Sequence, residues 1–472
     1  MIPDRGAWAP DRRLLTAGLI GLVTAAAFEG MAVPTVLPAM VRELGGLDLY
    51  GWAFSAFWLT NIIGITLAGS DADRQGPARS LVVGTVLFAG GMVVSGIADG
   101  MPAVIAGRAI QGFGSGAIGS VVYAAIARAY APSARPRMIA LVSSAWVVPG
   151  LVGPALAGFV ADAASWRWVF LGIVAPVLVM GVVVYPQLAA LGRIERATEP
   201  ARRDARRAVD ATQLAAGSTL ILTALSIGQA VLAIVLFAAG SLLAVAALRH
   251  LLPQGSLRLA PGRPSVVVAL FMVAFAFFGT EAYVPLAVVE VRGGSVILGG
   301  IALSAAAVTW ATGAWLQARA AAAAIRRTLV VVGAALIGAG IAITSLVLLP
   351  AAPLLVAALG WGVAGLGMGL AYSMLVLLML ESAPPGEEGM SSAALQLMFT
   401  LGTAFGAGVG GAVVALADAG ILELSGALGI VNAMMLVVSV LAILVALRVP
   451  RRPAPSIVRS DVASGPVPLE HP

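Results

Sequence analysis

Three charged side chains lie deep inside long apolar stretches of the sequence: Glu29, Arg108 and Glu281. Because a helix rises about 1.5 Å per residue, Glu29 lies about 22 Å from Leu14, where its stretch begins, and Glu281 about 24 Å into its own stretch. Ionisable groups at such depths are costly in a membrane and mark proton or substrate pathways. A carboxyl group that binds a proton when unpaired and releases it beside a cation can couple proton flow to other work. We therefore predict that Glu29 carries a proton.

Arg108 needs an acidic, polar or aqueous neighbour inside its span, and Glu29 is the acid that we expect beside it. Glu281 is expected to bind either substrate or a second proton. Structural alternatives exist for all three residues. Backbone groups near Pro34 could satisfy Glu29, the Arg108–Glu29 pair could be a purely structural clamp, and Glu281 could be a solvated acid near the mouth of its span.

The composition places the chain in a membrane. Of its 472 residues, 60% are hydrophobic and 11% are charged, with a mean hydropathy of +1.00, whereas about a quarter of the residues in a soluble domain are charged. The sequence has no Cys and no Lys, which excludes thiolate metal sites, a P-loop and a lysine Schiff base. Two His residues are too few for a histidine metal cluster. We expect no enzymatic activity, no metal and no cofactor, with a proton gradient as the energy source.

Apolar runs long enough to cross a bilayer predict fourteen membrane spans, if the long stretch 214–249 is a hairpin that turns near Gly228-Gln229. The other twelve runs fall near 14–41, 50–69, 79–98, 102–128, 138–161, 166–188, 265–289, 296–318, 328–349, 353–380, 389–417 and 426–447.

The arginines support the hairpin. With fourteen spans, 24 of the 28 basic residues fall on one side, which the positive-inside rule assigns to the cytoplasm together with both termini. A single helix over 214–249 would instead put most of the later arginines on the side that contradicts this rule. This placement also explains the net charge of +6 without nucleic-acid binding, so we expect the lipid bilayer and no nucleic acid as a partner.

We divide the chain into two six-helix bundles with a two-helix insert between them. The segments are a cytoplasmic N-terminus 1–13, an N-terminal bundle 14–188, a basic cytoplasmic linker 189–213, the insert 214–249, a cytoplasmic linker 250–264, a C-terminal bundle 265–448 and a disordered cytoplasmic tail 449–472.

An internal repeat supports this division. Four glycines of the fourth span recur in the twelfth at an offset of 253: Gly107, Gly112, Gly114 and Gly116 correspond to Gly360, Gly365, Gly367 and Gly369. Glu29 and Glu281 correspond at an offset of 252, while the counterpart of Arg108 is Trp361. Repeated halves with a substrate site between them are common in transporters.

The first half also contains three short motifs. They are Gly69-Ser70-Asp71-Ala72-Asp73-Arg74-Gln75-Gly76, then Arg108-Ala109-Ile110-Gln111-Gly112, and Pro149-Gly150 with Gly153-Pro154 and Gly158. Together they resemble motifs of the major facilitator superfamily, and within it the fourteen-span drug:proton antiporters of the QacA/EmrB type. The resemblance implies an all-α, major-facilitator-type fold.

The resemblance also implies roles for these motifs. Gly69, Asp73, Arg74 and Gly76 would form a cytoplasmic gate loop, Arg108 would take part in proton coupling, and Gly150, Gly153, Pro154 and Gly158 would form an antiporter-like helix motif. Further polar or aromatic residues of the spans could line a substrate cavity, although helix contacts or packing are the commoner explanation for such residues: Asn61, Gln111, Tyr123, Trp146, Trp361 and Gln396.

We predict a monomeric exporter in the cell membrane that exchanges protons for hydrophobic or amphipathic small molecules, cations included. Export of lipids or glycolipids by the same fold is the first alternative. A receptor or scaffold that transports nothing is the second.

Overall fold

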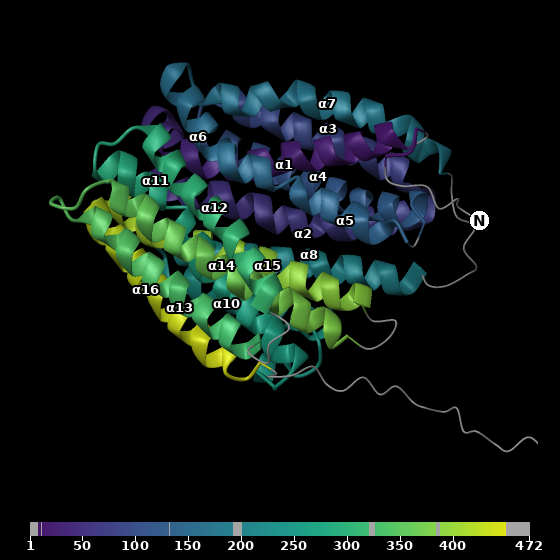
Figure 1. The fold of residues 1–472 in the computed structure, drawn as a ribbon. Helices are drawn as coiled ribbons and strands as arrows, with labels where there is room; N and C mark the ends of the chain where they lie inside the picture. The colour runs from purple at the N-terminus through teal and green to yellow at the C-terminus, as the bar shows by residue number, and fades with distance from the viewer. Residues whose placement is uncertain are drawn as a thin grey trace, which may run out of the picture.

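The computed structural model describes residues 8–10, 12–131, 133–191, 201–320, 326–383 and 388–449. Every regular element in these ranges is a helix. Thirteen described helices are long and apolar enough to cross a membrane, and a shorter apolar helix spans Val147–Ala163. The chain is therefore an all-helical, multi-pass membrane protein (Figure 1).

The first half begins with a long helix, α1, that continues through Pro34 and Pro38. Its seven helices are α1 (Arg13–Leu44), α2 (Tyr50–Gln75), α3 (Pro77–Gly96), α4 (Met101–Ala129), α5 (Arg135–Ser144), α6 (Val147–Ala163) and α7 (Arg167–Ala190).

The predicted continuous span 138–161 is wrong, because α5 ends at Ser144 and α6 begins at Val147. Pro149 explains the break. A proline lacks the N–H that would bond the carbonyl four residues earlier, and its ring collides with that carbonyl, which here belongs to Ala145. Proline is tolerated in the first turn of a helix, so α6 can start just before it.

Two helices follow the first half, α8 (Ala201–Ser226) and α9 (Ala230–Leu251), and the chain turns between them at Gly228. Their backbones touch where Gly217 faces Gly240. Leu222 of α8 packs between Leu59 of α2 and Ala404 of the second half, so this helix pair contacts both halves.

The second half has the same order of long helices as the first. Its helices are α10 (Arg263–Glu281), the short α11 (Val284–Leu286), a π-helical turn (Ala287–Val291), α12 (Val296–Ala320), α13 (Arg326–Ser345), α14 (Leu355–Glu381), α15 (Glu388–Asp418) and α16 (Leu424–Ala446).

The repeat seen in the sequence recurs in the packing. Gly107 of α4 lies against Gly91 of α3, and its counterpart Gly360 of α14 lies against Gly340 of α13. The contact of Gly112 with the carbonyl of Phe57 likewise recurs between Gly365 and Ala306. A Cβ atom at these glycines would meet backbone atoms, so glycine is what lets these helices approach so closely.

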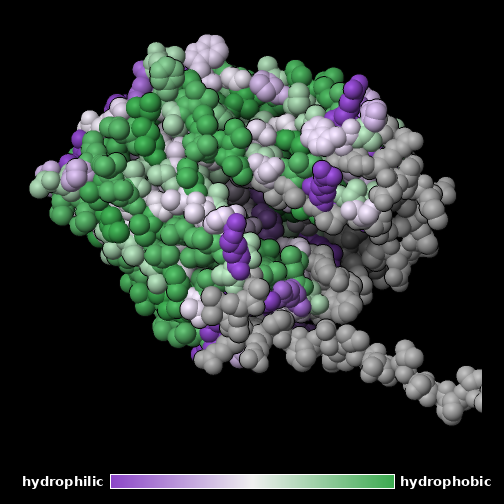
Figure 2. Space-filling model, in the orientation of Figure 1, coloured by the Kyte–Doolittle hydropathy of each residue, from purple (hydrophilic) through white to green (hydrophobic). Residues whose placement is uncertain are grey.

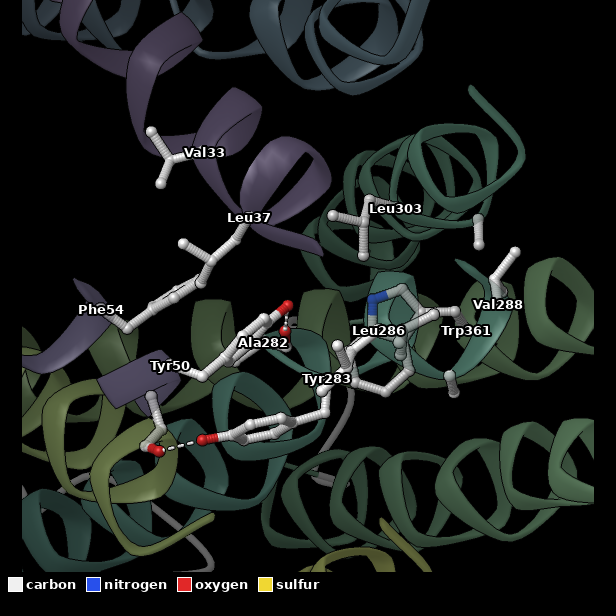
Figure 3. Packing of buried hydrophobic residues seen from close by; sticks show 14 of the residues in the cluster. Val33, Leu37, Tyr50, Phe54, Ala282, Tyr283, Leu286, Val288, Leu303 and Trp361 are labelled. Carbon is white, nitrogen blue, oxygen red and sulfur yellow. Dashed lines mark hydrogen bonds between the residues drawn. The ribbon is translucent and has the colours of Figure 1, made fainter. Parts of the chain in front are cut away.

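The two halves meet at one end of the molecule, which we call the closed end: it contains the C-terminus of α1, η1 (Leu47–Leu49) and the start of α12. A single apolar cluster joins both halves here and includes Leu37, Phe54, Leu286 and Leu303 (Figure 3). Tyr50 donates a hydrogen bond from its hydroxyl to the carbonyl of Ala282, 3.0 Å away.

Away from the closed end the halves separate. The space-filling view is hollowed between them, and hydrophilic side chains are visible inside the hollow (Figure 2). A hollow between the halves, away from the end where they are packed together, is consistent with one state of an alternating-access transporter.

Candidate functional site

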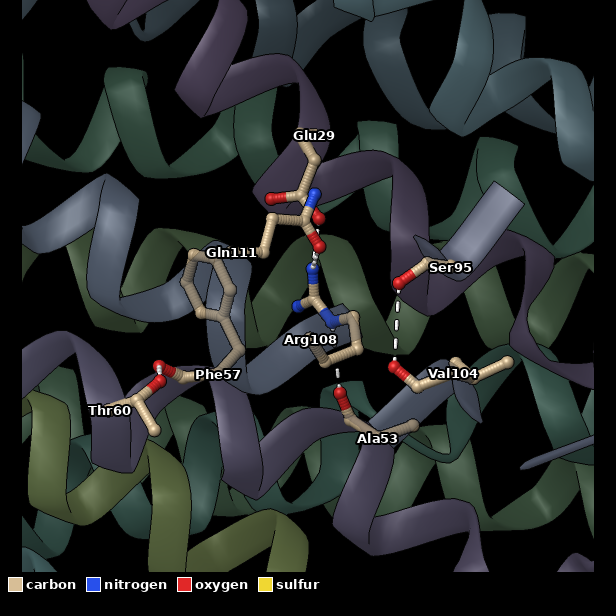
Figure 4. A network of polar contacts seen from close by, with 8 residues as sticks. All are labelled: Glu29, Ala53, Phe57, Thr60, Ser95, Val104, Arg108 and Gln111. Atoms are coloured by element: carbon tan, nitrogen blue, oxygen red, sulfur yellow. Dashed lines mark hydrogen bonds and ion pairs between the residues drawn. The ribbon is translucent and has the colours of Figure 1, made fainter. Parts of the chain in front are cut away.

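Arg108 and Glu29 form a buried ion pair in the first half, as the sequence predicts. Arg108 Nη1 contacts Glu29 Oε1, and the two side chains are only 2% and 1% exposed (Figure 4). Isolated charges at this depth would be costly, so each makes the burial of the other tolerable.

Three further contacts hold the guanidinium of Arg108. Its Nε donates to the carbonyl of Ala53 at 3.0 Å, and its Nη1 donates to Gln111 Oε1 at 3.0 Å. The ring of Phe57 lies 4.3 Å from Arg108 Cζ. Arg108 therefore joins α1, α2 and α4 through one side chain.

Close packing of two helix backbones explains how the side chain of Arg108 on α4 reaches a backbone carbonyl of α2. Gly112 sits against the carbonyl of Phe57, and Gly116 against that of Asn61. These glycines bring α4 close enough to α2 for the guanidinium to bond a backbone carbonyl. The glycine spacing predicts such close packing from the sequence alone.

Two polar atoms of the site have no hydrogen-bond partner within the described part of the chain. They are Glu29 Oε2 and Gln111 Nε2, and both are buried. Buried polar groups are normally satisfied, and an unpaired carboxylate oxygen is an available position for a proton.

Glu281 has a different partner from Glu29. Trp361, the counterpart of Arg108, directs its indole N–H at Glu281 Oε2 over 3.4 Å. Trp361 is fully buried and stacks on Phe277, with 4.7 Å between ring centroids. The second half therefore also has an acid beside a hydrogen-bond donor, but there the donor is neutral.

Five half-buried aromatic residues form a connected group, which we call the aromatic cluster. Neighbouring ring centroids in it are 5.3 to 6.5 Å apart. Its members come from α2, α10, α12, α14 and α15: Trp58, Phe278, Trp310, Tyr372 and Phe399. Phe277 connects the cluster to Trp361 through rings 5.6 and 4.7 Å away. Of these, only Trp361 was among the predicted cavity residues.

The other predicted cavity residues fall into two groups. Asn61 is buried and donates to the carbonyl of Gly112 over 3.3 Å, and Gln111 is buried beside Arg108. Tyr123, Trp146 and Gln396 are exposed, and Tyr123 lies within electrostatic range of Tyr372. Asn61 and Gln111 therefore make contacts between helices, which was the alternative explanation for them. The side chains of the other three are exposed on the surface of the protein.

The predicted gate loop is mostly helical, which corrects the expectation of a loop. Gly69 and the backbone of Asp73 and Arg74 belong to α2, and only Gly76, with φ +90°, separates α2 from α3. The side chains of Asp73 and Arg74 lie outside the described residues.

Asp71, which the sequence analysis did not single out, makes two contacts at this turn. It accepts a hydrogen bond from Ser80 at 2.7 Å and lies 3.8 Å from the guanidinium of Arg79.

The antiporter-like motif lies where α6 faces α1 and α12. A Cβ atom at Gly150 would lie 3.1 Å from Ala307, and one at Gly153 would lie 3.4 Å from Phe28. At Gly158 it would lie 2.6 Å from the Cα of Ile297. Gly300 of α12 packs against the carbonyl of Pro154. The motif is therefore an interface between the halves at the closed end.

Two contacts across this interface were missed by the sequence analysis. Asp162 accepts from the backbone N–H groups of Val296 and Ile297, at 3.3 and 3.0 Å, and so caps α12 from the other half. Arg42 and Glu290 form an ion pair at 2.9 Å. Their partners are more than a hundred residues apart, so no local pattern indicates them.

Comparison with known proteins identifies the family to which the chain belongs. Residues 18–407 match the model of the Major Facilitator Superfamily. The match confirms the family seen in the motifs, while the fourteen-span type stays a prediction.

Two of the similar proteins have names that refer to multidrug transport. The chain is 27% identical over 402 residues to the Probable multidrug-efflux transporter Rv1634 of Mycobacterium tuberculosis, covering 82% of this chain and 84% of that protein. It is 29% identical over 173 residues to the Multidrug transporter protein MdtP of Bacillus subtilis, covering 36% and 32%.

Among solved structures, a bacterial homologue of the human lysosomal transporter Spinster, in an inward-facing and unoccupied conformation, has the same fold. The TM-score is 0.63 at 14% identity, covering 93% of this chain and 98% of that one.

Proposed function

Because the chain belongs to the major facilitator superfamily, we propose that it exports hydrophobic or amphipathic small molecules, cations included, in exchange for protons. It acts as a monomer in the cell membrane, with both termini in the cytoplasm and with the proton gradient as its only energy source. The names of the multidrug-efflux relatives support drug-like cargo over lipid cargo.

The buried Arg108–Glu29 pair is the observation that carries the proposal. Deep in a membrane, a carboxylate is stable only beside a cation, and it otherwise takes up a proton. Any movement that separates the two side chains therefore favours protonation of Glu29, and their reunion releases the proton. Glu29 Oε2, buried without a partner, is an available position for that proton.

The surroundings of Glu29 suggest how the proton is coupled to the movement of the halves. The neighbouring Phe28 lies against Gly153 of α6, and Met31 lies against Gly150. Since α6 packs on α12 of the other half, a change in the position of α1 around Glu29 reaches the interface between the halves directly.

The aromatic cluster and Glu281 support a substrate site in the second half. Aromatic faces attract flat apolar groups and cations, and Glu281 has no cationic partner among the described residues.

The proton gradient is sufficient for such export. One proton that moves down about 100 mV and one pH unit supplies about 3.7 kcal/mol, enough for a roughly 500-fold gradient of a neutral substrate.

Transport in proteoliposomes with an imposed pH gradient tests the proposal. Glu29→Gln should abolish proton-driven accumulation of a fluorescent hydrophobic substrate while downhill equilibration continues. Glu43→Gln is the matched control, because Glu43 lies on the same helix in an exposed ion pair with Arg167. Undiminished uphill transport by Glu29→Gln would contradict the proposal.

A further inference from the structure

A groove separates α2 from the helix pair α8 and α9 in the half of the molecule away from the closed end. Its volume is about 430 Å³, and its walls are mainly apolar. The lining residues are Leu67, Ala208, Val209, Thr212, Gln213, Ala216 and Leu243. The helix α8 begins at Ala201, so the groove, lined by residues 208–216 of this helix, lies about two to four turns from its N-terminal end.

Basic side chains gather where this groove meets the end of the helix pair. Arg206 precedes Val209 by three residues and Gln213 by seven, so all three lie on one face of α8. His250 follows Leu243 by seven residues on α9, and its Nε2 lies 3.2 Å from Arg206 Nη2. Arg206 therefore stands at the mouth of the groove, bridged to the second helix that forms it.

The charge at this mouth is positive among the side chains that the structure describes. Arg206, Arg207 and Arg249 are exposed. The nearest described acid on α8, Asp210, is only 5% exposed and bonds His250 Nδ1 at 3.2 Å. On α2, Asp71 is engaged by Ser80 and Arg79.

We propose that this groove binds an anionic phospholipid of the membrane, with an acyl chain against α2, α8 and α9 and the phosphate beside Arg206. An apolar groove that ends in an exposed arginine near the end of a membrane-spanning helix matches the two parts of such a lipid. The bound lipid fills the gap between the first half and the helix pair. This inference does not depend on what the protein transports.

Native mass spectrometry of the purified full-length chain, titrated with phosphatidylglycerol or phosphatidylcholine, tests the proposal. The unmodified protein should retain phosphatidylglycerol more strongly than phosphatidylcholine. Arg206→Gln should weaken phosphatidylglycerol retention about fivefold and reduce the preference for it. Arg258→Gln removes the same charge from an exposed arginine that does not line or flank the groove and should change retention little.

A second variant tests the groove itself. Val209→Trp fills it without changing any charge and should reduce retention of phosphatidylglycerol as well. The proposal is overturned if either Arg206→Gln or Val209→Trp binds phosphatidylglycerol as the unmodified protein does. It is also overturned if the control variant loses as much binding as Arg206→Gln, because the effect would then be general electrostatics.

Discussion

Trp361 directs its indole N–H at Glu281, at the place in the second half where Arg108 contacts Glu29 in the first. The repeat has thus kept an acid and a donor in both halves but a permanent charge in only one. A neutral donor leaves the carboxyl group of Glu281 without a fixed counter-ion, so this acid is open to a mobile cation, whether a proton or a substrate. The difference between the two pairs suggests that the first half handles the proton and the second half the cargo.

Arg108→Gln should lower the melting temperature of the purified protein markedly, because it leaves Glu29 buried beside no cation. Breaking a buried ion pair from one side costs about 3–5 kcal/mol. The double variant with Glu29→Gln should recover most of that loss, while proton-driven transport stays absent. Thermal unfolding followed by fluorescence, together with the transport assay, separates stability from coupling. Equal melting temperatures for the single and double variants would speak against a charge pair.

Trp361→Arg should place a cation beside Glu281 and so compete with cationic substrates. We expect a higher KM for a cationic dye and a smaller change for a neutral compound of similar size. Trp361→Phe is the matched comparison, because it keeps the stacking on Phe277 and removes the N–H without adding charge. The same KM shift for both compounds in Trp361→Arg would count against a cation site at Glu281.

Asp162→Ala should loosen the closed end, because it removes the cap on the first N–H groups of α12. Loss of such a cap costs about 1 kcal/mol, which is a roughly fivefold shift in the balance between conformations. The chain has no native Cys, so a cysteine introduced at the buried Val33 reports opening by its rate of maleimide labelling. Asp418→Ala, at an exposed position on the same end, should leave that rate unchanged.

Gly158→Ala should force α6 and α12 apart, since the new Cβ atom would lie 2.6 Å from the Cα of Ile297. Overpacking of this kind costs about 1–3 kcal/mol, and transport activity should fall with it. Gly90→Ala is the control, because nothing lies within 4 Å of its added Cβ and alanine favours a helix. Comparing melting temperature and transport rate of the two variants checks this; similar losses in both would indicate a general effect of substitution.

Trp310→Leu should weaken binding of flat aromatic substrates, because it removes a central ring of the aromatic cluster. Base stacking on aromatic side chains is worth about 1–3 kcal/mol per ring, so we expect an increase in KM of about fivefold or more for planar compounds. Trp315→Leu, on the same helix but 55% exposed, should leave KM unchanged. Measured KM values for planar and non-planar compounds would test whether the cluster recognises flat molecules.

The sequence alone determined the membrane setting, the repeat and the long apolar helices apart from the broken run 138–161, for reasons that are local. A lipid environment requires long apolar helices, so hydropathy is read directly along the chain. Charges within such helices stand out against their neighbours, and for that reason Glu29, Arg108 and Glu281 could be found without a structure. Pro149 also indicates that the fifth span is broken, but the predicted unbroken run did not take this proline into account.

Only the tertiary structure decided which distant groups meet. Asp162 is an ordinary acid in the sequence and becomes the cap of α12 only because α6 packs against that helix. Trp361 contacts the carboxylate of Glu281, and Trp58 packs against Phe399 of the other half. Both contacts join segments that are far apart in the sequence. The groove beside α8 likewise depends on how closely the helix pair approaches α2. Hydropathy within one helix specifies that it is buried in the membrane, but the shapes of two helices together determine what they contact.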